Sequence, residues 1–242
     1  MLLEAQNPQQ DNANHDERDP DAGPHPFRWW NGVVPSDDPT LVESIDHELL
    51  RASFQPTDAA RALLEENLNS KVVRHRVLAL RGLVRLNLMT PTRWRQTLGD
   101  PDPDVRRDAL EQLAHAPLED DGVLDVVLEL LNDDDALVVD AAAFALGEHA
   151  YVGGVEQLCV IAKDHDDARC RESAIASLGA IGDDRAREVI LGALRDKAPI
   201  RRRAIVALAN FEGPDIDAAL ETASEDRDWQ VRSAVTQLRD DN

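Results

Sequence analysis

Arginine is the residue whose chemistry this sequence repeats most regularly. A planar guanidinium binds a carboxylate or a phosphate through two parallel hydrogen bonds. The regularly spaced arginines are Arg74, Arg106, Arg171, Arg201 and Arg232, with Val139 in the corresponding place once. A second set lies outside this spacing and consists of Arg76, Arg107, Arg202 and Arg203. These residues can pair with carboxylates inside the protein, or they can bind an anion or an acidic peptide from outside.

A repeat of about thirty residues positions these arginines. Each copy starts with an apolar residue or a cysteine directly before the arginine position, and the starts are Val73, Val105, Val138, Cys170, Ile200 and Val231. Successive starts are 32, 33, 32, 30 and 31 residues apart. That period is the length of two short helices with their turns, so we predict an all-α array of about six stacked helix pairs.

The residue types around each start predict how the second helix of a pair packs. Small or apolar residues follow the starts by four positions, one helical turn later on the same buried face: Val77, Ala109, Ala142, Ala174, Ala204 and Val235. Small residues follow by nine positions, which suits close helix crossing: Gly82, Ala114, Gly147, Gly179 and Ala209. Good N-cap residues precede by three positions, with Lys197 departing: Ser70, Asp102, Asp135, Asp167 and Asp228.

Stacking of the repeats gives the regularly spaced arginines a structural role. Because helices pack about 10 Å apart, these arginines form a row near the carboxylates of adjoining caps, and we expect an Asp-Arg ladder that ties the repeats together. The alternative is a strip that binds an anion or an acidic peptide. The second set of arginines exceeds what a ladder requires, so it is the better place to look for such binding.

The chain divides into three parts. We expect a disordered acidic tail over residues 1–38, a capping helix over 39–56 and the repeat array over 57–242. First helices are expected near 58–68, 91–98, 119–131, 153–163, 184–195 and 214–223. In the tail, Trp29 and Trp30 either dock onto the exposed first helix of the array, which we prefer, or form a short motif that a partner binds.

The segment DARCRESAIASLGAIGD, residues 167–183, resembles the HEAT-like repeat of the phycobilisome-lyase type. That pattern runs Asp-x-x-Val-Arg, Ala, Ala-Leu-Gly and Ile-Gly-Asp, and Cys170 replaces the valine. The resemblance covers residues 57–240 and is weaker in the end repeats, where Leu80 and Leu238 stand one residue early. It implies a right-handed α-α superhelix of the HEAT or armadillo type. Similar proteins include chromophore lyases and many binding scaffolds.

Composition limits the partners. The net charge is -21 over 242 residues, and residues 39–242 carry 39 acidic against 24 basic residues. This charge opposes nucleic acids and anionic membranes and favours a basic or cationic partner. Positive charge comes almost entirely from arginine, which fits a GC-rich genome or salt adaptation equally well. The first residues lack a leader pattern and no stretch approaches ~20 apolar residues, so we expect a soluble cytoplasmic protein.

Metal and catalytic chemistry has little support. A related metal-dependent hydroxylase family uses repeated His-Glu dyads, whereas this chain has one, His47 with Glu48. We read Asn132 to Asp135 as a turn and an N-cap, and we expect no metal and no cofactor. Phosphate-loop, Ser-His-Asp and Cys-His arrangements are not identifiable. Cys159 and Cys170 take aliphatic positions of the repeat, so buried free thiols are expected rather than a disulfide.

The function that fits these observations is a non-catalytic scaffold. We expect the second helices to line a concave surface and to bind a protein partner through the arginine ridge and adjacent apolar side chains. One alternative is a lyase-like enzyme or chaperone acting on a tetrapyrrole or chromophore protein. Another is a protein similar to helical-repeat DNA-repair glycosylases, with Trp94 or Trp229 near Asp100 or Asp228. We expect instead that Trp94 packs within its repeat and that Trp229 covers the terminal helix.

Overall fold

The described residues of the computed structural model are 39–118 and 122–240, and all of them belong to one compact unit. Trp29 and Trp30, with the rest of residues 1–38, lie outside the described residues. Within the described ranges the regular structure is entirely helical. The α-helices are α1 (Pro39–Ala52), α2 (Asp58–Asn67), α3 (Val73–Arg85), α4 (Pro91–Leu98), α5 (Pro103–Leu113), α6 (Gly122–Glu129), α7 (Ala136–Glu148), α8 (Val155–Asp164), α9 (Ala168–Ile181), α10 (Arg187–Ala193), α11 (Ala198–Ala207), α12 (Pro214–Ala223) and α13 (Trp229–Asp240).

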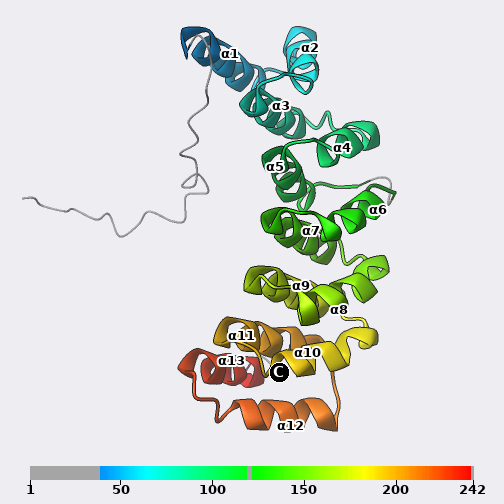
Figure 1. Cartoon of the computed structure of the whole chain (residues 1–242), viewed down its shortest axis with the longest axis vertical. Helices are drawn as coiled ribbons and strands as arrows, with labels where there is room; N and C mark the ends of the chain where they lie inside the picture. Colours follow the sequence, from blue (N-terminus) through cyan, green and yellow to red (C-terminus); the bar gives the residue numbers. More distant parts are fainter. Residues whose placement is uncertain (1–38, 119–121, 241–242) are drawn as a thin grey trace, which may run out of the picture. The chain divides into compact units, whose positions relative to one another are not determined.

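These helices form six consecutive pairs, which confirms the predicted all-α solenoid. The second helices, α3 to α13 in odd numbers, stack on one another in one layer, and α1 packs on α3 at the beginning of that layer (Figure 1). The first helices, α2 to α12 in even numbers, form the other layer. Short 3-10 turns join successive pairs at Val152–Gly154, Asp184–Ala186 and Leu208–Asn210, and a further one, Leu130–Asn132, lies within the third pair between α6 and α7.

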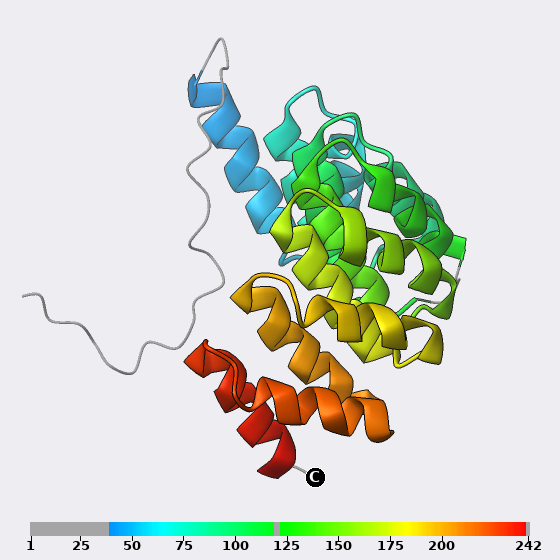
Figure 2. The same cartoon turned by 60° about the horizontal axis from the view of Figure 1, so that its bottom comes forward.

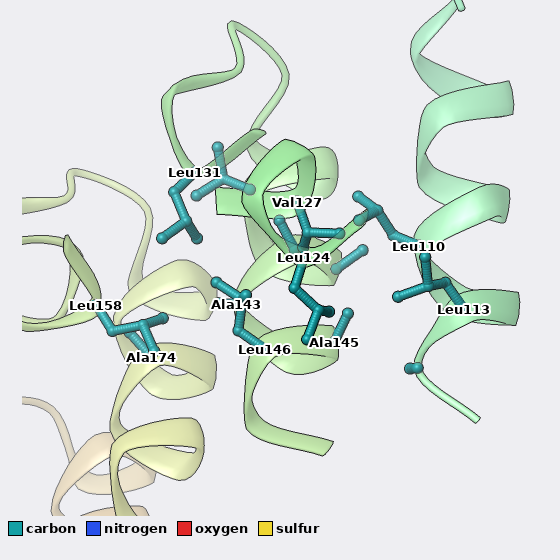
Figure 3. Packing of buried hydrophobic residues seen from close by; sticks show 14 of the residues in the cluster. Leu110, Leu113, Leu124, Val127, Leu131, Ala143, Ala145, Leu146, Leu158 and Ala174 are labelled. Carbon is teal, nitrogen blue, oxygen red and sulfur yellow. The ribbon is translucent and has the colours of Figure 1, made fainter. Parts of the chain in front are cut away.

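The interior between the two layers is apolar and nearly continuous along the array. In Figure 3, Leu124 and Val127 of α6 gather with Leu110 of α5 and Leu146 of α7 in one cluster. Each of these side chains is buried, and burial of one such side chain stabilises the fold by about 1.5 to 3 kcal/mol. Because the side chains come from successive pairs, the interior holds neighbouring repeats together.

The buried positions confirm the predicted repeat frame in five copies and correct it in the first. Val105, Val138, Cys170, Ile200 and Val231 are all buried, as are the residues four positions later.

In the first copy, Val73 and Val77 are only half-buried, whereas His75 and Ala79 are buried. The frame of this copy is therefore two residues later than the sequence suggested. With His75 as its start, Leu83 takes the place of the buried leucines of the inner repeats, and the apparent irregularity at Leu80 disappears.

Aspartate side chains begin most second helices, as expected. Asp102, Asp135 and Asp167 are N-caps whose carboxylates accept the N–H two residues later. Ser70 is not the N-cap of α3, because that helix begins at Val73 after Val72; the Ser70 hydroxyl accepts the N–H of Val72 instead. The capping interaction offsets backbone N–H groups that the helix leaves unpaired.

Two glycines in the second helices let adjacent repeats approach closely. A Cβ on Gly147 of α7 would lie 2.8 Å from the Cα of Ser177 in α9. A Cβ on Gly179 of α9 would lie 2.6 Å from the Cα of Ala207 in α11. Both distances are too short for a side chain against backbone, which confirms the predicted close crossing at these positions.

Candidate interaction surface

An arginine ladder joins adjacent repeats at the start of the second helices. The fourth residue of α3, α5, α9 and α11 supplies the guanidinium, which binds both oxygens of one aspartate in the loop before the next second helix. The pairs are Arg76 with Asp100, Arg106 with Asp133, Arg171 with Asp196 and Arg201 with Asp226, at 2.7 to 3.0 Å. These arginine side chains are only 7 to 16% exposed. The predicted ladder is therefore present.

The ladder aspartates differ from the predicted ones. They are not the caps themselves but stand one or two residues before the cap, as Asp100 stands before Asp102. Asp100 binds Arg76 through its carboxylate, and its backbone carbonyl accepts a 2.8 Å hydrogen bond from Arg106. Asp226 repeats this arrangement with Arg201 and, through its carbonyl, with Arg232 at 2.7 Å. The loops that contain Asp100, Asp196 and Asp226 therefore each link two successive arginines.

Hydrogen bonding to arginine stabilises the charged form of the ladder aspartates. The hydrogen bond from Arg171 lowers the pKa of Asp196 below its ordinary value, and the hydrogen bond from Arg201 lowers the pKa of Asp226 in the same way. The arginines change in the opposite sense, because the same bonds raise their pKa. At neutral pH these aspartates are therefore charged, and each is already bound to its ladder arginine.

One rung of the ladder is absent, at the junction of α7 with α9. Val139 takes the arginine position and is buried, and His165 takes the aspartate position of the next loop. The ring Nδ1 of His165 accepts the N–H of Asp167 at 3.1 Å, as the carboxylate of Asp100 accepts the N–H of Asp102 at 2.9 Å. Both partners of the rung are therefore replaced together.

Arg74 and Arg76 exchange the roles that the sequence indicated. Arg76 belongs to the ladder, whereas Arg74 binds Asp46 of α1 at 2.6 Å and so ties the capping helix to α3. The cause is the two-residue shift of the first repeat, which puts Arg76 rather than Arg74 in the fourth place of its helix.

A Ser-His-Asp grouping, which motif reasoning did not find, lies beside this ion pair. His75 Nδ1 is 3.2 Å from Ser70 Oγ, and His75 Nε2 is 3.5 Å from Asp46 Oδ1. Burial lowers the pKa of His75, so the ring is neutral at physiological pH. Ser70 already accepts the N–H of Val72, and Asp46 holds Arg74. The grouping therefore joins α1 to the first repeat, and its spacing in sequence gives no signal of it.

The remaining predicted arginines lie on the opposite face of the second helices from the core. Arg107 pairs within its own helix with Asp104 at 3.0 Å and with Glu111 at 3.6 Å. Arg203 reaches Glu172 of α9 at 3.4 Å, a long contact for an ion pair. For Arg202, the residues from 39 to 118 and from 122 to 240 supply no hydrogen-bond or ion-pair partner. As expected, Arg107, Arg202 and Arg203 do not belong to the ladder.

Exposed apolar side chains share this face, which we call the outer ridge. It comprises residues two and six positions after the repeat starts, together with the first residue of each second helix, and Arg203, three positions after Ile200, lies at its edge. Phe144 of α7, Val206 of α11 and Trp229 of α13 are large, exposed and located here, at 41%, 53% and 66% exposure. The prediction that Trp229 covers the terminal helix is wrong. Trp94, in contrast, is buried within its repeat as expected.

Helices α11 and α13 are neighbours at the C-terminal end of the array (Figure 2). The outer ridge has a hollow between these two helices. This hollow, the terminal groove, has a volume of about 320 Å³. Arg202, Arg203 and Val206 line it from α11. Trp229, Gln230, Ser233, Ala234 and Gln237 line it from α13. Its lining therefore contains two arginines and no carboxylate.

A larger hollow of about 530 Å³ lies at the second pair, lined by the end of α3 and the loop after it, by α4 and by the end of α5, with Val123 of α6. Apolar side chains such as Met89, Trp94 and Val123 line it, together with Glu111 and His115. Burial raises the pKa of Glu111. This hollow contains neither lysine nor arginine, and none of the predicted arginines contributes to it.

The structure also describes the turn over residues 132–135 and the two cysteines. The carboxylate of Asp135 caps α7 and Asp133 belongs to the ladder, which confirms the predicted turn. Both cysteines are free; Cys170 is buried, but Cys159 is only half-buried, contrary to expectation. Burial raises the pKa of Cys170 to about 11. Among the described residues, His, Cys, Asp and Glu side chains form no group of three able to hold a metal ion.

None of the helices in the described ranges is long and apolar enough to cross a membrane.

Comparison with known proteins agrees with this architecture. An engineered protein superposes with a TM-score of 0.57 at 21% identity, over 75% of this chain and 57% of its own, so the chain spans less than two thirds of that protein. YibA of Escherichia coli gives 0.57 at 17% identity, over 85% and 75% of the two chains. A designed armadillo repeat protein in complex with the peptide (KR)4 gives 0.51 at 13% identity, over 81% and 97%. No curated protein matches the sequence.

The family comparison is decisive for the repeat itself. Residues 91–176 and 155–239 match HEAT repeats, and together they cover more than half of the sequence. Their limits include the ladder pairs from Arg106 to Asp226 and the whole terminal groove. The chain belongs to the HEAT-repeat family.

Proposed function

We propose that this chain is a non-catalytic HEAT-repeat scaffold that binds a protein partner on the outer ridge of its second helices. The observation that carries the proposal is the combination of exposed side chains on that ridge. Val206 and Trp229 expose apolar surface beside Arg202 and Arg203, and Phe144 exposes more apolar surface on α7 of the same ridge. Tryptophan and arginine contribute more binding energy at interfaces than most residue types.

The ladder supports this proposal because it distinguishes arginines that stabilise the fold from arginines that are available to a partner. Arg106, Arg171 and Arg201 hold aspartates of the next repeat and are almost fully covered, so they keep the ridge in shape. Arg202 and Arg203 are adjacent to Arg201 but point to the ridge. The designed armadillo protein in complex with (KR)4 is a similar stack of helices with a peptide bound, and the proposal extends peptide or protein binding to this chain.

The proposal includes two finer assignments. We infer that the repeats are of the phycobilisome-lyase-like type, supported by residues 167–183, in which Asp167 caps α9 and Gly182 ends it with a left-handed φ of 68°. The sequence contains no chromophore-specific motif, so the assignment concerns the repeat and not a lyase activity. A cytoplasmic location is part of the same proposal, and the free thiols of Cys159 and Cys170 support it.

A pair of matched valines tests the scaffold proposal. Val206 lies on the outer ridge and Val160 lies on α8 in the layer of first helices, and the two are 53% and 57% exposed. The tagged wild-type chain, Val206→Glu and Val160→Glu would be used to purify partners from cells, with quantitative mass spectrometry. We expect Val206→Glu to lose at least one protein that Val160→Glu retains. Equal recovery by both variants would refute binding on the ridge.

A further inference from the structure

The terminal groove differs from the rest of the protein in charge. The chain carries a net charge of -21, yet the eight residues that line this groove include two arginines and no acid. In the ladder, by contrast, each arginine binds two oxygens of one aspartate at 2.7 to 3.0 Å. The terminal groove therefore places two arginines outside the ladder side by side, with no acidic residue in its lining.

The hydrogen-bond and ion-pair partners of the two groove arginines indicate which ligand these arginines can bind. The described residues give Arg202 no partner, and Arg203 has only the 3.4 Å contact with Glu172. A guanidinium in a hollow keeps its donors in a fixed plane that fits a carboxylate through two hydrogen bonds. Two adjacent guanidinium groups therefore suit two carboxylates that are close together, as in a run of Asp and Glu.

Trp229 adds an apolar anchor beside these charges. The corresponding first residue of the other second helices from α5 onward is small or proline: Pro103, Ala136, Ala168 and Ala198. Only α13 has a tryptophan there, and it is 66% exposed. A buried aromatic side chain covers about 150 to 250 Å², so an exposed indole next to Val206 offers a large apolar contact to a partner.

We propose that the terminal groove binds an acidic peptide segment of a partner protein, with carboxylates on Arg202 and Arg203 and an aromatic or aliphatic side chain against Trp229 and Val206. This site lies on the ridge of the proposed scaffold function and rests on it. Gln230, Ser233 and Gln237 line the same groove and offer donors and acceptors to the peptide backbone. Charge complementarity with Arg202 and Arg203 favours an acidic segment over a basic or purely apolar one.

Nucleic acid is the other polyanion to consider. Strong binding to phosphates needs many basic contacts along the backbone, whereas this groove has two arginines within a surface of opposite overall charge. A segment of four or five residues with local acidity and one apolar side chain fits the groove better. A nucleic acid is therefore a competing outcome of the test.

The test uses the full chain and an array of eight-residue peptides. Each probe contains four Asp or Glu residues and one Phe, Leu or Ile, and its matched control contains Asn and Gln instead. We expect a subset of acidic probes to bind the wild-type chain at least tenfold more strongly than their amide controls. Binding should weaken at least tenfold in Arg202→Glu and in Trp229→Ala, and it should fall with added salt.

A charge-matched control keeps the test specific. Arg195 is an exposed arginine in the turn after α10, away from the groove, and Arg195→Glu changes the net charge by the same amount as Arg202→Glu. This control should bind the acidic probes as wild type does. Because Arg202 makes no hydrogen bond or ion pair within the described fold, Arg202→Glu should also keep the wild-type melting curve, so that lost binding does not reflect unfolding.

Three results would overturn the proposal. They are equal binding of acidic and amide probes, equal loss in Arg195→Glu and Arg202→Glu, and tighter binding of a ten-nucleotide single-stranded DNA than of any acidic probe. If partners captured from cells depend on Phe144 but not on Arg202 or Trp229, the groove assignment is wrong while the scaffold function stands. If the Val206 and Val160 variants recover the same proteins, the scaffold function itself fails.

Discussion

Replacement of Arg201 by methionine tests the ladder most directly. Arg201 donates two hydrogen bonds to Asp226, at 2.8 and 2.7 Å, and a third to the carbonyl of Asp196 at 2.9 Å. Methionine keeps much of the apolar volume of the side chain but removes the charge and all donors. The change therefore isolates the ionic part of one rung.

The expected cost follows from burial. The Arg201 side chain is 7% exposed and that of Asp226 is 16% exposed. Removing one partner of a buried pair costs about 3 to 5 kcal/mol, but Asp226 keeps some access to water and a 2.8 Å hydrogen bond from the N–H of Asp228. We expect a loss of about 2 to 3 kcal/mol, intermediate between a buried pair and a charged hydrogen bond.

Hydrogen exchange is the appropriate assay, because a repeat array can open locally rather than all at once. A loss of about 2 to 3 kcal/mol raises the opening equilibrium roughly 30- to 150-fold. Peptides from α11, α12 and α13 should show this faster exchange, whereas those from α3 and α5 should not. Mass spectrometry resolves these segments.

The pH dependence has a defined sign. The hydrogen bond from Arg201 lowers the folded-state pKa of Asp226 below the unfolded value of about 3.9. The rung's contribution is therefore complete above the unfolded pKa and disappears as the pH falls through the folded pKa. The difference between wild type and Arg201→Met should be full near pH 7 and should shrink as the pH falls below about 4.

The neighbouring residue provides the control. Arg202 is one residue away on the same helix and has no partner among the described residues. Surface changes of this kind usually alter stability by less than about 0.5 kcal/mol, so Arg202→Met should exchange as wild type does. Equal acceleration by the two substitutions would show that the ladder contributes nothing of its own.

Three further outcomes follow from packing and burial. Gly179→Ala should lower the urea midpoint by an amount equivalent to about 1 to 3 kcal/mol, since its Cβ would meet backbone, whereas Gly192→Ala should stabilise by up to about 1 kcal/mol because nothing lies within 4 Å. Val139→Arg should lower the melting temperature through an unpaired buried charge, and adding His165→Asp should recover most of the loss. Cys170 should resist iodoacetamide at pH 8 until urea unfolds the chain, because burial raises its pKa to about 11.

The inner repeats were predictable because two signals, the helical period and an aspartate N-cap, coincide in most of them. Val105, Ala109 and Leu113 follow the helical period, and Asp102 caps the same helix. The first repeat was assigned two residues early because Val73 followed by Arg matches the apolar-arginine pattern locally. His75, the actual start, is polar and was not recognised as a core residue, although Leu83 eight positions later marks the correct frame.

The candidate surface was only partly predictable. Sequence spacing separates Arg202 and Arg203 from the ladder, because these two follow Arg201 directly and the repeat needs one arginine. Sequence spacing does not indicate that Asp226 rather than Asp228 pairs with Arg201. Both aspartates precede α13, and only the geometry of the turn distinguishes the ladder residue from the N-cap. The exposure of Trp229 depends on its helix having a neighbour on one side only in the described array.

The missing rung at Val139 and His165 has a consequence for the order in which the repeats unfold in acid. Most contacts that join α7 to α9 there are apolar or hydroxyl contacts without a titrating group, including the 2.7 Å hydrogen bond from Ser177 to the carbonyl of Ala143. A carboxylate also takes part, because Asp140 of α7 accepts a hydrogen bond from the Ser173 hydroxyl of α9. The rungs on either side lose their aspartate charges as the pH falls. Digestion by pepsin in acid should therefore release the two ends first and leave a resistant central fragment around residues 136–181.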